Sequence, residues 1–74
     1  MRITYDEAAD AAYIYLVHEI GYGAVTRTLI GPVIEKGTAV NLDFADGGRL
    51  LGIELLGAHR LLAPDVIAHL KLSE

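Results

Sequence analysis

Three acidic side chains fall within five residues near the N-terminus, at Asp6, Glu7 and Asp10. Hard divalent cations bind several carboxylate oxygens, so one interpretation of this cluster is a weak cation site. The spacing does not match a calcium-binding loop. Asp6 is a good helix N-cap and Glu7 suits a first helical turn, so the other interpretation is a capped turn whose acids face water. The spacing favours the capped turn.

A second polar group, Asn41, Asp43 and Glu54, falls on one side of a predicted β-hairpin. Two carboxylates can perform acid–base chemistry when their surroundings separate their pKa values. The alternating pattern favours the alternative, the polar side of a sheet that faces solvent or a partner. The sequence leaves open which of the polar residues converge in space: Asp6, Asp10, Asn41, Asp43 and Glu54.

Residues typical of metal and nucleophile chemistry are sparse. His18, His59 and His69 occur singly, whereas a zinc site needs three or four convergent ligands. The absence of cysteine excludes disulfides and thiolate ligands. The Gly21–Gly23 segment lacks the lysine and further glycine of a phosphate-binding loop. We therefore expect no catalytic residue, metal ligand set or cofactor, and we predict that the protein is not an enzyme.

Four tyrosines, Tyr5, Tyr13, Tyr15 and Tyr22, are candidates for a binding surface, because tyrosine is common at protein interfaces. A core tyrosine with a satisfied hydroxyl is the alternative interpretation. Tyr13 and Tyr15 lie on the second face of a predicted strand whose first face already suits a core. The sequence weights the two interpretations evenly.

Period-two patterns predict the strands that position these residues, at 2–5, 11–17, 24–30, 39–44 and 50–56. Both faces of the second segment are apolar, which predicts a central strand covered on both sides.

The C-terminal segment has a helical pattern instead. Pro64 and Asp65 favour a helix start, and Leu62, Val66 and Leu70, with Ile67, form an apolar stripe at helical spacing. The elements together predict a single α+β domain over residues 1–74, with a small antiparallel sheet of four to five strands and one short C-terminal helix.

The clearest hairpin joins residues 39–44 to residues 50–56. Its apolar stripes must share one face, because a slip of one residue turns a strand's side chains to the other face. A two-residue loop at Gly47 and Gly48 meets this condition and places Asn41 opposite Glu54 and Asp46 opposite Arg49. A three-residue loop would meet it only with a bulge.

The composition favours self-association. The chain has 74 residues, of which 53% are hydrophobic, and a domain of this size buries only roughly 60% of its unfolded-chain surface. A surplus of apolar side chains favours an interface. We expect a homodimer that buries the Tyr13/Tyr15 face, the C-terminal helix or both. The predicted interface residues are Tyr13, Tyr15, Leu50, Leu56, Leu62, Val66 and Leu70.

The charge pattern argues against other partners. The formal net charge is −4, and the six basic residues are spread along the chain, so direct nucleic-acid binding is not expected. No apolar run approaches the ~20 residues that a bilayer requires, and the first residues do not form a signal peptide. We expect a soluble cytoplasmic protein that does not bind membranes.

Two segments resemble a known family. They are Tyr5-Asp6-x-x-Ala9-Asp10-Ala11-x-Tyr13-Ile14-Tyr15-Leu16 and Asp46-Gly47-x-Arg49-Leu50-x-Gly52-Ile53-Glu54-Leu55-Leu56. Their order and spacing are similar to those of the small bacterial family called domain of unknown function 2283 (DUF2283). The extra glycine at Gly48 departs from the family's usual turn, which puts the turn type in question.

The resemblance implies a small β-rich domain with a C-terminal helical segment, and it supplies no activity. Members of the family are often encoded beside small toxin-like proteins, which suggests an antitoxin or partner role. Our leading hypothesis is therefore a non-enzymatic protein-interaction module, with an antitoxin-like role toward a small toxin as one form of it. The alternatives are a self-assembling structural oligomer without an external ligand and a weak metal-binding or acid–base enzyme that uses surface carboxylates.

Overall fold

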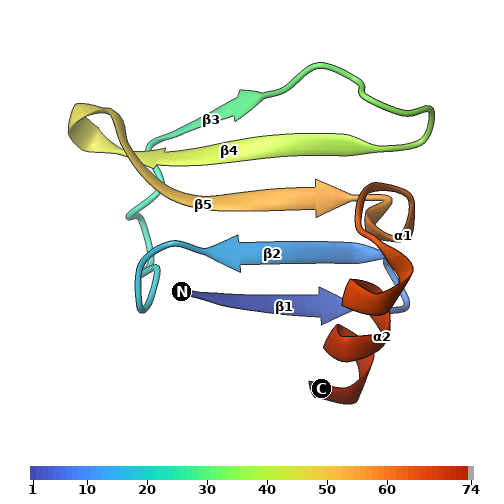
Figure 1. The fold of residues 1–74 in the computed structure, drawn as a ribbon. Helices are drawn as coiled ribbons and strands as arrows, with labels where there is room; N and C mark the ends of the chain where they lie inside the picture. Colours follow the sequence, from blue (N-terminus) through green and yellow to red (C-terminus); the bar gives the residue numbers. More distant parts are fainter. Residues whose placement is uncertain (74) are drawn as a thin grey trace.

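Alternating side chains and turn-forming glycines build a five-stranded antiparallel sheet, which two short helices follow (Figure 1). This computed structural model describes residues 1–73. The predicted α+β fold is confirmed. The elements are β1 (Arg2–Asp6), β2 (Ala11–Tyr15), β3 (Arg27–Ile30), β4 (Ala39–Ala45), β5 (Arg49–Leu56), α1 (Ala58–Leu61) and α2 (Pro64–Ser73).

The strand order is β1-β2-β5-β4-β3, so β1 and β3 are the edges of the sheet. Strand β2 is an interior strand, as predicted, between β1 and β5. Within residues 1–73 only one face of β2 is covered, and the covering expected for the other face, a second copy, stays a prediction. Both helices lie at the end of the sheet where β1 and β5 end, over one face, and neither extends over β3 or β4 (Figure 1).

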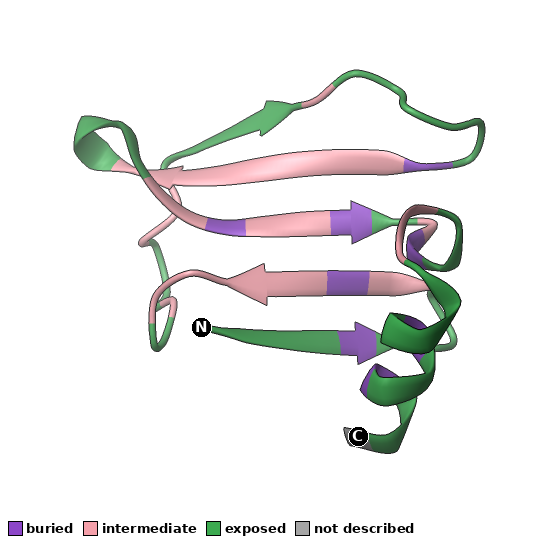
Figure 2. Ribbon diagram, viewed as in Figure 1, coloured by how far each residue is buried: buried purple, intermediate pink, exposed green. Residues whose placement is uncertain are grey.

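The core lies between the helices and the face of β1, β2 and β5 that they cover, called here the core face (Figure 2). Leu62 packs against this core, and Leu70 is only 6% exposed, so both are used within the chain. Of the two neighbouring stripe residues, Ile67 is buried in the core, whereas Val66 is 37% exposed. The buried hydrophobic residues are Tyr5, Ala12, Leu55, Ala58, Ile67 and Leu70.

The turn between β4 and β5 differs from the predicted two-residue loop. Asp46–Gly48 forms a three-residue 3₁₀ turn, in which Gly47 and Gly48 have φ values of 80° and 75° that favour glycine. Ala45, rather than Asp46, therefore pairs with Arg49.

An extra residue in β5 compensates for the odd loop length. Asp43 pairs with Gly52 and Phe44 with Leu50, which leaves Leu51 as a bulge. The bulge restores the predicted pairing of Asn41 with Glu54. Leu50 was predicted as an interface residue on the same face as Tyr13 and Tyr15. The bulge instead places it opposite Phe44, on the other face of the sheet.

The molecule is a flat slab of 35 × 27 × 17 Å. Its accessible surface is 5123 Å², about 15% more than the ~4,500 Å² typical of a monomeric protein of 8.0 kDa. Two features contribute to the surplus: the helices cover only part of one sheet face (Figure 1), and large apolar side chains in and after β3 are exposed. In the described part of the chain, neither helix has the length and apolar character needed to cross a membrane.

Candidate functional site

The sheet face opposite the helices, called here the open face, carries a row of polar and aromatic side chains from four strands. Alternation along the strands sends these side chains to one side. The pairing of Tyr13 with Glu54, and of Glu54 with Asn41, aligns them across the sheet. The open face comprises Tyr13, Tyr15, Thr28, Asn41, Asp43, Gly52, Glu54 and Leu56.

Tyr13 crosses a neighbouring strand to reach its hydrogen-bond partner. Its hydroxyl donates to Asp43 Oδ2 at 2.6 Å, and β5 lies between the two strands that carry these residues. The ring passes over Gly52, where a Cβ atom would lie 2.7 Å or less from three Tyr13 atoms. Glycine is therefore required at position 52 so that the Tyr13 ring can approach the β5 backbone closely. Close approach of another group is a common reason for a glycine inside a strand.

Asp43 extends this bond into a chain across the sheet. Its other oxygen, Oδ1, accepts a hydrogen bond from Thr28 Oγ1 at 2.6 Å, so β2, β4 and β3 are linked above β5. Burial raises the pKa of Tyr13, and the hydrogen bond and charge of Asp43 raise it further. Tyr13 is therefore a protonated donor at neutral pH, and its ring is held in one orientation.

A second polar pair adjoins this chain. Asn41 Nδ2 donates to Glu54 Oε1 at 3.1 Å. Asn41 Oδ1 is shielded from solvent and accepts no hydrogen bond within residues 1–73. Asp43 and Glu54 thus both accept hydrogen bonds from neutral donors.

Aromatic side chains form the other part of the open face. The Tyr13 and Tyr15 rings are 4.8 Å apart between centroids and tilted by 57°, a favourable arrangement for an aromatic pair. The Arg2 guanidinium carbon lies 3.8 Å from the centroid of the Tyr15 ring, within cation–π range. The half-buried aromatic pair is therefore fixed in place by contacts at both ends.

The acidic turn separates into three unrelated contacts, so it forms a capped turn. Asp6 Oδ1 accepts from the Ala9 backbone N–H at 3.3 Å, and Glu7 pairs with Lys71 at 2.9 Å. Asp10 turns instead toward helix α1. No three His, Cys, Asp or Glu side chains gather into a metal-binding group anywhere in residues 1–73.

Asp10 joins the β1–β2 turn to the start of α1. Its carbonyl accepts from the Ala58 N–H at 2.9 Å, and its Oδ1 accepts from the His59 N–H at 3.0 Å and the Tyr5 hydroxyl at 3.0 Å. Oδ2 contacts His59 Nδ1. Because Gly57 at the helix start has no side chain, Asp10 caps the helix from a distance. We call this group the clasp.

The clasp also sets the charge state of Asp10. Burial raises the pKa of its carboxyl, but the hydrogen bonds from His59 and Tyr5 outweigh burial, and the pKa lies below its usual value. The clasp therefore contains a carboxylate at neutral pH. Its contacts are those of a helix cap, and the described residues place no nucleophile against the His59 ring.

The remaining candidates do not assemble into one site. His18 follows β2, His59 belongs to the clasp, and His69 lies on α2. Tyr5 is buried in the core, whereas Tyr22 is fully exposed in the loop before β3. Only Tyr13 and Tyr15 of the four tyrosines contribute to the open face.

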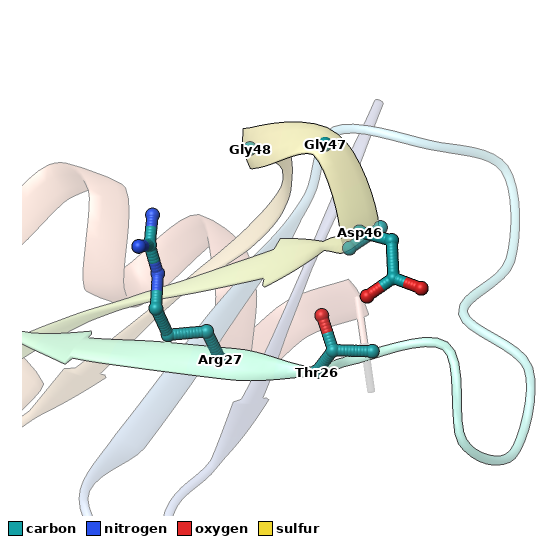
Figure 3. Close-up of a pocket in the computed structure, with 6 residues that line it drawn as sticks. Thr26, Arg27, Asp46, Gly47 and Gly48 are labelled. Carbon is teal, nitrogen blue, oxygen red and sulfur yellow. The ribbon is translucent and has the colours of Figure 1, made fainter.

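A shallow cavity of about 420 Å³ lies beside the β4–β5 turn (Figure 3). The Thr26 and Asp46 side chains point toward one another, while the Arg27 side chain extends away from them (Figure 3). The Arg27 guanidinium instead lies 5.2 Å from the centroid of the Phe44 ring. This cavity brings no group of functional side chains together. Its lining residues are Thr26, Arg27, Ala45, Asp46, Gly47 and Gly48.

Comparison with protein-family models gives a match over residues 2–59, to the family described as protein of unknown function (DUF2283). The chain belongs to the DUF2283 family. The match covers all five strands and the beginning of α1, which confirms the resemblance found in the sequence. Comparisons with curated proteins and with solved structures give no match.

The residues that carry the DUF2283 resemblance fall into two places in the structure. Tyr5 and Asp10 form the clasp, whereas Tyr13, Gly52 and Glu54 belong to the open face. Sequence reasoning identified Glu54 and Tyr13 but assigned no role to Gly52. A glycine within an otherwise regular strand was the available signal for a side chain crossing that strand. Thr28 and Arg2 gave no such signal, because their partners lie on other strands.

Proposed function

We propose that the protein is a non-enzymatic protein-interaction module and that the open face binds the partner. The observation that carries the proposal is the Tyr13–Asp43–Thr28 chain, which holds half-buried and exposed side chains in one arrangement on a sheet face that the helices do not cover. Rigid aromatic groups lose little conformational entropy on binding, which makes Tyr13 and Tyr15 suitable contact residues.

The proposed partner is a small protein, and a toxin-like protein is the kind that the family resemblance suggests. An antitoxin-like role would require the open face to cover a surface of that partner. Leu56, 37% exposed on this face, adds an apolar contact beside the polar chain. A cytoplasmic location, as expected from the sequence, belongs to the same proposal.

Self-assembly is the second candidate function, and the surplus accessible surface of the single chain supports it. A metal-binding or acid–base enzyme has less support. Asp43 and Glu54 bond to neutral groups, and the carboxylates of the acidic turn diverge.

Affinity capture of the native chain with mass spectrometry tests the proposal. The comparison uses the wild type, Tyr15→Glu on the open face, and Leu72→Glu as the matched control, because Leu72 is an exposed helix residue outside the open face. We expect one small protein in stoichiometric amount with the wild type and Leu72→Glu, and its loss with Tyr15→Glu. Retention of that protein by a folded Tyr15→Glu variant would refute open-face binding.

Sedimentation velocity separates the second candidate from the first. If the open face joins two copies, Tyr15→Glu will be monomeric at a concentration where Leu72→Glu is dimeric. A dimer that persists in Tyr15→Glu places the second copy on another surface.

A further inference from the structure

The two edges of the sheet differ in their protection. Helix α2 packs beside β1, whereas no element within residues 1–73 covers β3 (Figure 1). All four β3 residues are exposed, and Arg27 is the only charged residue among them. Natural proteins usually protect an edge strand with charges, bulges or a covering segment, since an open edge invites another strand. The exposed apolar residues in and after β3 are Leu29 (54%), Ile30 (76%), Val33 (73%) and Ile34 (69%).

The hydrogen-bond pattern shows which β3 peptide groups are available. Gly31 N–H donates to the Val40 carbonyl at 2.8 Å, in register with the β3–β4 pairs. In an antiparallel ladder, alternate residues bond to the same neighbour. Leu29 therefore bonds to β4, while the peptide groups of Thr28 and Ile30 point away from the sheet.

We propose that β3 pairs with β3 of a second copy of this chain, antiparallel and about a two-fold axis through Leu29. Thr28 then lies opposite the partner's Ile30, and the reverse pair forms by symmetry. These two pairs use all the outward N–H and C=O groups of Thr28 and Ile30 in four hydrogen bonds. The result is a continuous ten-stranded sheet across two molecules.

The side chains fit this register. Leu29 lies directly opposite the partner's Leu29, on the face where Leu42 and Phe44 are uncovered by the helices. Arg27 lies opposite the partner's Gly31, so like charges do not meet. Pro32 has no N–H and ends the new ladder, which limits pairing to a closed dimer.

The exposed area also fits a second copy. The surplus over a typical monomer is roughly 600 Å², the same order as the ~800 Å² that each partner buries in a standard interface, and the exposed apolar residues in and after β3 contribute to it. This inference names the surface for the second candidate function, self-assembly. It does not depend on partner binding at Tyr13 and Tyr15, because edge pairing leaves these two residues uncovered.

Two double variants test the proposed pairing of Thr28 with the partner's Ile30. They differ only in the residue at position 30, which is positively charged in one variant and negatively charged in the other. Thr28→Lys/Ile30→Lys places like charges opposite each other twice, whereas Thr28→Lys/Ile30→Glu places opposite charges together twice. We expect the wild type and the Lys/Glu variant to be dimers in sedimentation velocity, and the dissociation constant of the Lys/Lys variant to be about tenfold higher or more than that of the Lys/Glu variant. Tyr15→Glu should remain dimeric.

Amide hydrogen exchange of the wild type provides a second measurement without mutation. The Thr28 and Ile30 N–H groups should exchange slowly in the dimer and rapidly after dilution to monomer. A wild type that is monomeric at high micromolar concentration would overturn the proposal. So would equal dissociation constants for the two folded double variants, or rapid exchange of both amides in a dimer. Loss of the dimer in Tyr15→Glu alone would place the second copy on the open face instead.

Discussion

Replacing Gly52 by alanine should force the Tyr13 ring away from Asp43. The added Cβ would lie 2.7 Å or less from the ring atoms and hydroxyl, which is closer than real Cβ contacts. The displaced hydroxyl would lose its 2.6 Å bond to a carboxylate, which typically contributes about 1.5–3 kcal/mol. Alanine would restrict the unfolded chain and return roughly 0.4–1 kcal/mol. We expect a net destabilisation of about 1–2 kcal/mol.

A double-mutant cycle tests the cause of that loss. In a Tyr13→Thr background the ring is absent and the strand propensity is kept. Gly52→Ala should then stabilise the protein by roughly 0.4–1 kcal/mol, because only the backbone effect remains. The sign of the Gly52→Ala effect therefore reverses between the two backgrounds.

Tyr15→Thr is the matched control background. Tyr15 pairs with Gly52 across the β2–β5 ladder, yet its ring is not among the atoms that the new Cβ would meet. Gly52→Ala should remain destabilising in this background. Urea unfolding of the six proteins gives the free energies of unfolding. An equal cost of Gly52→Ala in the wild-type and Tyr13→Thr backgrounds would refute the ring-crossing argument.

Three further predictions concern the clasp, Tyr13 and the core. Asp10→Ala should lower the free energy of unfolding by about 1–2 kcal/mol, because the remote helix cap is lost. The lowered pKa of Asp10 gives the wild type stability that is present above about pH 4 and is lost as the pH falls through the pKa of the folded state. In acid unfolding, the stability of the variant should therefore change less with pH below about pH 4 than that of the wild type. The raised pKa of Tyr13 has the opposite effect: the free energy of unfolding should fall as the pH rises above about 10. Tyr13→Phe should reduce this dependence on pH in urea unfolding at alkaline pH. An unchanged dependence would contradict the assignment to Tyr13. Leu70→Ala should lower the free energy of unfolding by about 2–5 kcal/mol in thermal or urea unfolding, because Leu70 is buried. Leu72→Ala, at an exposed position of the same helix, should lower it by less than about 0.5 kcal/mol. Similar losses for both variants would show that α2 does not dock as described.

The arrangement of the β4–β5 hairpin was predictable because of its apolar stripe. A stripe on one face restricts the register to shifts of two residues, which is why the pairing of Asn41 with Glu54 is correct. The loop length was not determined by the same rule. A two-residue turn and a three-residue turn with a bulge keep the stripe together equally well, and Gly48 permits the second.

The clasp and the Tyr13 chain could not be predicted, because their partners meet only in the folded chain. Asp10 and His59 are 49 positions apart, and Tyr13 and Asp43 are 30 apart. Helix α1 has only four residues, and its cap comes from another element, so it carries no local start signal. The predicted helix stripe is correct for Ile67 and Leu70, which are buried, but Val66 is exposed because α2 turns Ile67 toward the core instead.

Hydroxyl-radical footprinting of the native assembly, read by mass spectrometry, tests most directly whether the open face binds a partner. It compares the oxidation of Tyr15 and Leu56 in the captured assembly with that in the isolated chain, and Tyr22 is the internal control because it is fully exposed outside the open face. We predict that Tyr15 and Leu56 become protected in the assembly while Tyr22 is oxidised equally in both. Unchanged oxidation of Tyr15 and Leu56 in an assembly that contains the partner would contradict the proposed function.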